Sequence, residues 1–195
     1  GTRLDSGWGF EGELKYKTAG DRQDVAFDNT VGSGHELTAS YQYRLNSKWM
    51  LTPSFALESI EKSTAYKMGL KATYKVTDAL SVAGRYRYDS IKLDRDKVNE
   101  DMPDHAQDDQ SINRYDAYIN YAPKGPWAYE YQLTYYDADY IRYDSGKKDY
   151  EQNAVLKYKW DKHWVPFVEV GDMKVDAYDD ERQLRLRVGV QYNFL

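Results

Sequence analysis

Apolar and polar side chains alternate with a period of two residues in ten separate segments of this chain. These segments lie near residues 8–17, 36–44, 49–59, 66–76, 80–88, 114–121, 127–136, 150–160, 164–171 and 181–194. Successive side chains of a β-strand point to opposite faces of a sheet, so this pattern predicts strands. No segment carries the spacing of an amphipathic helix. We therefore predict an all-β chain with ten strands, each of about ten residues.

The two faces of these strands differ in charge. No position that we assign to the apolar face is Asp, Glu, Lys or Arg, although 30% of the chain is charged. On the polar face, basic residues exceed acidic residues by five, whereas the whole chain has a net charge of −5. Much of the remaining negative charge falls in the segment 89–110, which we interpret as an acidic loop. One face is therefore predicted to meet an apolar medium, and the other to meet water with cations in excess.

Aromatic residues mark the two ends of the apolar face. All five Trp lie beside short connections, and a second group of tyrosines lies beside the long connections. The predicted aromatic girdle contains Trp8, Trp49, Trp127, Trp160, Trp164, Tyr88 and Tyr135. Amphipathic aromatic rings concentrate where lipid meets water, and short turns alternating with long polar loops are typical of outer-membrane barrels. These features predict a transmembrane antiparallel β-barrel that forms a single domain over residues 1–195.

The main alternative fold is a soluble β-sandwich, whose strands also alternate because their apolar faces pack into a shared core. The girdle and the absence of charge on the apolar face favour the barrel, because a cation facing hydrocarbon near the bilayer midplane costs about 2–4 kcal/mol. A helical membrane protein is excluded, since no run of apolar residues is long enough to form a spanning helix.

Composition excludes several kinds of site. The chain has no Cys, which rules out thiolate metal sites, thiol nucleophiles and disulfides. It has no basic cluster, which argues against a nucleic-acid partner. His105 lies close to Asp104 and Asp108, but we interpret this segment as a solvated acidic loop rather than an acid–base pair. We predict no catalytic residue, metal or cofactor; a barrel enzyme (protease or lipid-modifying) and an adhesion barrel are the alternative functions.

The polar face predicts a narrow, water-filled bore. Arginine and lysine at alternate strand positions would offer a passing anion a row of weak, exchangeable contacts. We call the predicted pore-lining residues the cation track: Arg44, Lys67, Lys71, Arg85, Arg87, Arg114, Lys157, Lys159, Arg185 and Arg187. The competing interpretation is that these cations neutralise acidic residues on neighbouring strands and only rigidify the barrel.

Four segments resemble the KdgM family of oligogalacturonate-specific porins, which also includes a sialic-acid channel. They are RYRYD (85–89), RYDAY (114–118), WVPFVE (164–169) and RQLRLRVGVQY (182–192). The resemblance implies a monomeric barrel of twelve strands in the outer membrane of a Gram-negative bacterium, surrounded by lipid and lipopolysaccharide. It also implies a pore for acidic oligosaccharides, lined by Arg85, Arg87, Arg114, Arg185 and Arg187. Because we count ten strands, we expect the family's opening hairpin to be missing from this sequence.

Residue pattern and resemblance together predict a porin that lets acidic oligosaccharides such as oligogalacturonate diffuse passively through a pore favouring anions. A channel for sialic acid remains an alternative, because a row of cations suits either sugar.

Overall fold

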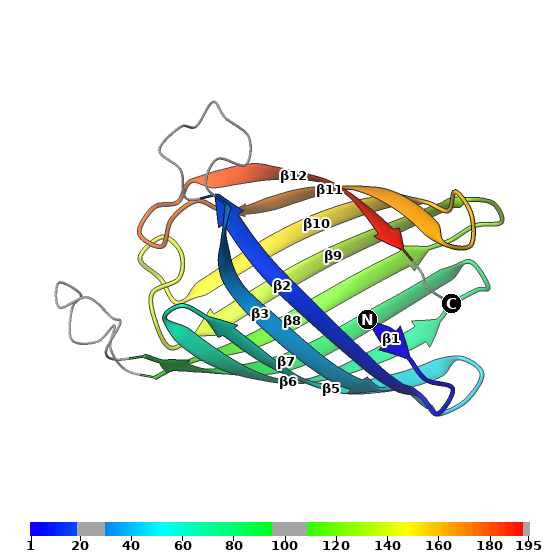
Figure 1. Ribbon diagram of the computed structural model, residues 1–195, viewed down its shortest axis with the longest axis horizontal. Coiled ribbons are helices and arrows are strands. Elements are labelled where there is room, and N and C mark those ends of the chain that lie inside the picture. The colour runs from blue at the N-terminus through cyan, green and yellow to red at the C-terminus, as the bar shows by residue number, and fades with distance from the viewer. Residues whose placement is uncertain (19–29, 95–108, 193–195) are drawn as a thin grey trace.

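The computed structural model describes residues 1–18, 30–94 and 109–192 of the chain. These residues form one antiparallel sheet of twelve strands (Figure 1). The strands are β1 (Thr2–Arg3), β2 (Trp8–Thr18), β3 (Thr30–Tyr41), β4 (Tyr43–Arg44), β5 (Trp49–Ile60), β6 (Ser63–Lys75), β7 (Leu80–Leu93), β8 (Gln110–Tyr121), β9 (Trp127–Ala138), β10 (Lys148–Tyr158), β11 (Trp164–Lys174) and β12 (Arg182–Tyr192). Within this described part, no helix is long and apolar enough to cross a membrane.

The ten segments predicted from the alternation each form a long strand. The other two strands contain only two residues each: β1 pairs with the start of β2, and β4 continues the path of β3 along β5. The all-β prediction is therefore confirmed, and β1 and β4 account for the difference between ten strands and twelve.

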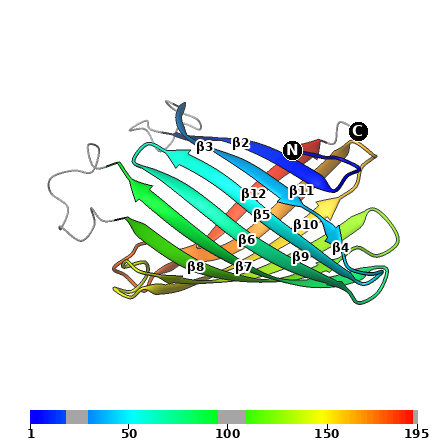
Figure 2. The same cartoon turned by 90° about the horizontal axis from the view of Figure 1, so that it is seen from below.

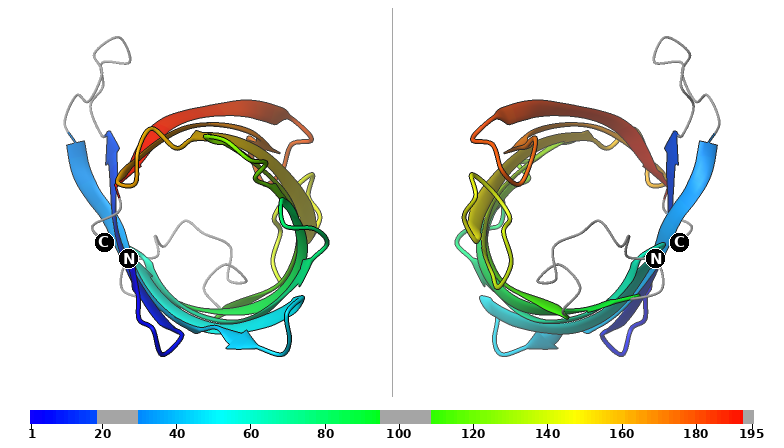
Figure 3. Two further views of the ribbon diagram at one scale, coloured as in Figure 1. Left: turned by 90° about the vertical axis from the view of Figure 1, so that its right-hand side faces the viewer. Right: turned by 90° about the vertical axis from the view of Figure 1, so that its left-hand side faces the viewer.

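The long strands lie side by side in the sheet in the order in which they follow one another in the chain. The strands are inclined to the long axis of the molecule (Figure 2), and seen end-on the sheet curls into a ring (Figure 3). Among the described residues, no ladder joins β12 to β1 or β2. This shape accounts for the alternation, because a curled sheet turns one set of side chains inward and the other outward.

Two strands extend further than the sequence pattern predicts. β7 runs to Leu93, so Asp89 lies within a strand and not in the predicted loop 89–110. β10 begins at Lys148, which places Asp149 in the sheet, and it ends at Tyr158, which leaves Trp160 beyond it. Cross-strand pairing to β6 and β8 supports the longer β7. His105 lies outside the described residues.

Short turns at one end of the sheet are stabilised by their own side chains. Asn46 accepts hydrogen bonds from the amides of Lys48 and Trp49, both at 2.9 Å. Asp161 accepts them from His163 at 2.7 Å and Trp164 at 2.8 Å. These amides, led by that of Trp164, stabilise the ionised carboxylate and lower the pKa of Asp161 below its usual value. Each turn thereby directs the chain into a strand that begins with Trp.

Pairs of aromatic rings lie next to these short turns. The ring centres of Trp164 and Tyr192 are 4.7 Å apart, and those of Trp127 and Tyr158 are 4.8 Å apart. Equivalent cross-strand pairs are Trp8–Tyr41, Trp49–Tyr74 and Tyr121–Tyr129. A belt of contacting rings therefore follows the short-turn end of the sheet.

Large apolar side chains cover the outer face of the sheet. Leu184 and Val188 of β12 are each 74% exposed, and most outward positions of the other long strands are exposed as well. The buried apolar residues are few, and the largest cluster of them contains Ile112, Tyr136 and Ala138. The described part of the chain thus lacks the large dry core that a soluble sandwich would need.

Candidate functional site: a charged lumen

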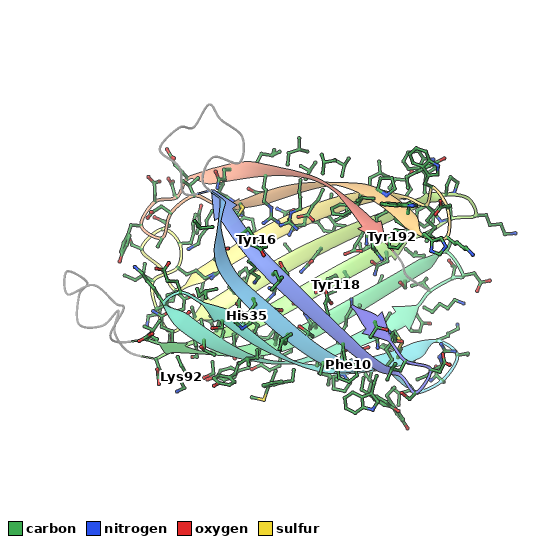
Figure 4. All side chains as sticks on the ribbon, in the orientation of Figure 1. Phe10, Tyr16, His35, Lys92, Tyr118 and Tyr192 are labelled. Carbon is green, nitrogen blue, oxygen red and sulfur yellow. The ribbon has the colours of Figure 1, made fainter. Side chains whose placement is uncertain are left out.

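Contacts between strands that are not neighbours identify the inner face of the ring. Nζ of Lys67 on β6 lies 2.7 Å from Oε2 of Glu36 on β3, although β5 lies between these strands. Arg185 on β12 likewise donates to Asn153 on β10 at 3.0 Å, across β11. Only the concave side of a curled sheet brings alternate strands this close. Figure 4 shows Tyr118 among the side chains that project into this interior, which we call the lumen.

One buried carboxylate organises the wall formed by β7, β8 and β9. The side chain of Asp116 is fully shielded from solvent and accepts from Arg85 Nε at 2.8 Å and from Arg114 Nε at 2.9 Å. It also accepts from Thr134 at 2.7 Å and from Gln132 at 2.8 Å. Four donors therefore satisfy a charge that would otherwise be costly to bury.

A second cluster crosses β2, β3, β5 and β6. Lys67 lies 2.7 Å from each of two carboxylates, Glu36 and Glu58. Lys15 forms an ion pair with Glu58 and lies 3.6 Å from Glu36. Two cations and two anions thus balance one another, so this part of the wall contributes no excess charge to the lumen.

Most other members of the cation track also have carboxylate partners. Arg87 donates through Nε and Nη2 to Asp89, at 2.7 and 2.6 Å. Lys157 pairs with Glu130 at 2.9 Å. Glu169 receives both Arg185 at 2.8 Å and Arg187 at 3.5 Å. The inclusion of Asp89 and Asp149 in strands makes the inner face more acidic than the sequence pattern indicates.

Three members of the track form no ion pair with any described residue. Arg44 and Lys159 are exposed near the short-turn end of the sheet. Lys71 is different, because it lies inside the lumen with its Nζ 3.9 Å from the centre of the Tyr118 ring. Among the described residues, the track thus divides into a majority paired with carboxylates on the inner face and three members that are not paired.

Sequence reasoning missed two arginines at the long-loop end. Arg142, from the connection between β9 and β10, lies over the Tyr136 ring at 3.8 Å and 3.2 Å from the carboxylate of Asp149. Arg182, the first residue of β12, pairs with Asp172 at 3.0 Å and approaches Asp149 to 3.6 Å. Asp149 is buried, yet neither of its oxygens accepts a hydrogen bond of normal geometry. No periodic pattern marks Arg142, since it lies in a loop.

The loop that carries Arg142 is tied to the loop between β11 and β12. The amides of Asp144 and Ser145 donate to the carbonyls of Asp179 and Ala177, at 3.2 and 3.1 Å. The hydroxyl of Tyr143 donates to the carbonyl of Asp180 at 2.5 Å. These bonds fix the position of one loop against the other and hold Arg142 at the mouth of the lumen.

Two tyrosines on the inner face hold cations by their rings. Lys71 and Arg85 lie over the Tyr118 ring, and Arg114 and Arg142 lie over the Tyr136 ring, at 5.3 and 3.8 Å from its centre. An aromatic ring attracts a cation without cancelling its charge, unlike a carboxylate. Both tyrosines lie at positions of their strands that the alternation assigns to the polar face. An aromatic residue at such a position was the sequence signal that could have identified them.

The described residues contain no group of three or more His, Asp or Glu side chains arranged to hold a metal ion. Of the predicted girdle residues, Trp8, Trp49, Trp127, Trp160, Trp164 and Tyr135 are exposed, and Tyr88 is half-buried. The groups gathered on the inner face are thus ion pairs, hydrogen bonds and aromatic rings.

Comparison with known proteins supports this interpretation. A family model described as "Oligogalacturonate-specific porin protein (KdgM)" matches residues 1–194. The oligogalacturonate-specific porin KdgM of Dickeya dadantii is 36% identical over 205 residues, covering 98% of this chain and 81% of the relative.

Solved structures give the same result for the fold. A KdgM porin in complex with disordered oligogalacturonate matches with a TM-score of 0.73 and 30% identity, covering 100% of this chain and 88% of that one. The NanC porin matches with a TM-score of 0.76 at 19% identity, covering 99% of this chain and 89% of that one. This second match concerns the fold alone. Both neighbours share the curled sheet described above.

Proposed function

This chain belongs to the KdgM family of oligogalacturonate-specific porins, and from this premise we propose that it carries acidic oligosaccharides across the outer membrane by passive diffusion. Homologues are outer-membrane porins of Gram-negative bacteria, and membership of a porin family indicates a channel rather than an enzyme. The substrate class follows from the relatives named for oligogalacturonate, one of them solved in complex with it.

The observation that carries the proposal is the concentration of cations on the inner face. Positive side chains from β6, β7, β8, β10 and β12 face one lumen, and they are held either by carboxylates or by aromatic rings. Forked guanidinium donors and compact ammonium groups suit the carboxylates of uronate sugars. A series of weak contacts lets an anion enter and still leave. We propose that the cation track forms this path, with Arg142 and Arg182 at its long-loop end.

The outer face supports a lipid-exposed wall. Its apolar side chains and the belt of aromatic pairs match the hydrocarbon band and interfacial rings of transmembrane barrels. We propose that polar loops at the opposite end from the short turns reach the level of lipopolysaccharide, and that one chain forms the pore as a single domain. Light scattering of the protein in detergent would test the monomer, and a mass of two or more chains would contradict it.

Conductance and uptake test the proposed function together. In a planar bilayer with a salt gradient, the protein is expected to conduct and to show a reversal potential that favours chloride over potassium. In a porin-deficient strain, its expression is expected to restore uptake of a galacturonate trimer but not of a neutral trisaccharide of similar size. No conductance, or a preference for cations, would contradict the proposal.

The sialic-acid alternative is separated by the same uptake assay. One relative is named as an N-acetylneuraminic acid channel, at 24% identity over 97% of this chain. Faster uptake of sialic acid than of galacturonate oligomers would favour this alternative, because a cationic lumen suits both acids.

A further inference from the structure

The charge balance of the lumen singles out Lys71. Within the described residues, the cations deep in the lumen pair with carboxylates: Arg85 and Arg114 with Asp116, Arg87 with Asp89, Lys67 with Glu36 and Glu58, Lys157 with Glu130, and Arg185 and Arg187 with Glu169. Lys71 shares their face but forms no ion pair or hydrogen bond with a described side chain. Its positive charge is therefore not cancelled by a direct neighbour.

The position of Lys71 explains why no carboxylate reaches it. Its Cα is paired with Arg85 on β7, and the carboxylate next along that row, Asp116, already accepts hydrogen bonds from four other donors. The ammonium instead lies 3.9 Å from the centre of the Tyr118 ring, two strands away. Tyr118 is buried, so the ring is a fixed seat for the cation.

The chemistry of this seat differs from that of an ion pair. The face of a ring attracts an ammonium through its quadrupole, but it leaves the formal charge in place and uses none of the three N–H donors. A carboxylate, in contrast, would offset the positive charge and accept from one or more of these N–H donors. Lys71 can therefore meet an anion in the lumen with its full charge and all three N–H donors, whereas each paired arginine has a carboxylate that balances its charge.

We propose that Lys71, seated on the ring of Tyr118, is the specificity-determining contact for the carboxylates of passing acidic sugars, whereas the paired arginines mainly hold the wall together. This inference rests on the proposed porin function and names the residue within the cation track that carries anion selectivity. A single free ammonium gives a weak contact, which suits passage rather than retention.

The test compares two lysines of the same strand and the same face. Lys71→Gln removes the free cation, and Lys75→Gln removes the same formal charge from the end of β6, where Lys75 pairs with the exposed Asp78. Each variant is measured by reversal potential in a potassium chloride gradient and by block of current with a galacturonate trimer. We expect Lys71→Gln to lower both the chloride preference and the trimer affinity about fivefold, from the attraction between unit charges about 4 Å apart in water. Lys75→Gln is expected to change both by much less.

Variants of the ring test the seat separately from the charge. Tyr118→Phe keeps the ring and is expected to behave as the wild type, whereas Tyr118→Leu keeps every charge but is expected to weaken trimer block. Heat-modifiable migration in gels verifies that each variant forms a barrel. If Lys71→Gln fails that check, Lys71→Met, which keeps the aliphatic stem, replaces it.

The outcomes distinguish this inference from the porin function. A wild type that prefers anions, together with equal effects of Lys71→Gln and Lys75→Gln, would overturn the inference alone, because only summed charge would then matter. A selective wild type and an unaffected Lys71→Gln would do the same. A wild type with no anion preference would contradict the proposed function and this inference with it.

Discussion

Nε of Arg85 donates to Oδ2 of Asp116 at 2.8 Å, and the carboxylate that receives it is completely shielded from solvent. Arg114 donates to the other oxygen of the same group. The two arginines lie on adjacent strands and would repel each other without this shared anion. Asp116 therefore stabilises a wall of like charges, and its removal is expected to affect folding more than conduction.

We predict that Asp116→Ala lowers the free energy of unfolding by about 3 kcal/mol, because removal of one partner leaves buried charges uncompensated. Glu130→Ala is the matched control, since Glu130 pairs with Lys157 at 2.9 Å but both side chains are about one-third exposed. That change is expected to cost about 1 kcal/mol or less. Urea unfolding in detergent micelles measures both values, and equal losses would show that burial of Asp116 contributes nothing.

Charge reversal is predicted to have opposite consequences at two positions of the cation track. The Arg187 side chain is 54% exposed, and its contact with Glu169 is long, at 3.5 Å. Arg187→Glu is therefore expected to leave the barrel folded and to reduce anion preference. Arg85→Glu would place a second carboxylate beside buried Asp116 and is expected to impair folding. Gel migration and reversal potentials distinguish these results. A fully folded Arg85→Glu variant would contradict the role we give Asp116.

A glycine on the inner face provides space for an arginine. A Cβ on Gly171 would lie 2.4 Å from Oδ1 of Asn153, the atom that accepts from Arg185 at 3.0 Å. Gly171→Ala is therefore expected to displace Asn153 and to lower the free energy of unfolding by about 1–2 kcal/mol. At Gly84 on the outer face, the nearest atom to an added Cβ is 4.0 Å away. Gly84→Ala is the control, and a loss there as large as at Gly171 would refute the packing argument.

The loop at the mouth contains two residues in a backbone conformation that favours glycine. Asp144 and Ser145 have φ of 46° and 55° and lie between Tyr143 and Gly146, which form a β-bridge. Ser145→Gly is expected to stabilise this turn by up to about 1 kcal/mol, because a left-handed conformation costs a non-glycine residue. Tyr143→Phe removes the hydrogen bond to the Asp180 carbonyl and is expected to loosen the loop that contains Tyr143. Limited proteolysis should be slower for the first variant and faster for the second; the reverse order would contradict the proposed coupling of the two loops.

Acid is predicted to weaken one short turn but not its counterpart. The pKa of Asp161 is lowered because the amides of Trp164 and His163 donate to its carboxylate. Its contribution to stability is therefore present at neutral pH and lost as the pH falls below its usual pKa of 3.8 and through the lowered value. The destabilisation by Asp161→Ala should disappear in acid. Asn46→Ala removes the same kind of hydrogen bond between a side chain and the turn, but from a neutral side chain, so its destabilisation should persist. The free energy of unfolding of each variant, measured at neutral pH and in acid, checks this prediction. A parallel pH dependence of the two variants would contradict it.

The two faces of the long strands were predictable from the sequence. Arg85 and Arg87 face the lumen, and Leu184 and Val188 face outward, because neighbouring residues of a strand alternate whatever the rest of the fold does. The ends of strands were less predictable. Asp89 was assigned to a loop because the acidic run that follows it hides the continuing alternation, and only pairing of β7 with β6 and β8 shows that the strand includes it.

Which cations are neutralised was decided by tertiary structure alone. Asp116 reaches Arg85 because of the register between β7 and β8, and Lys71 reaches Tyr118 because the sheet curves enough to bring alternate strands together. Register and curvature depend on the whole sheet, whereas alternation depends on neighbouring residues only. The sequence by itself therefore determined the two faces and their chemical character; the folded sheet determined which charges of the described residues cancel and which, such as that of Lys71, do not.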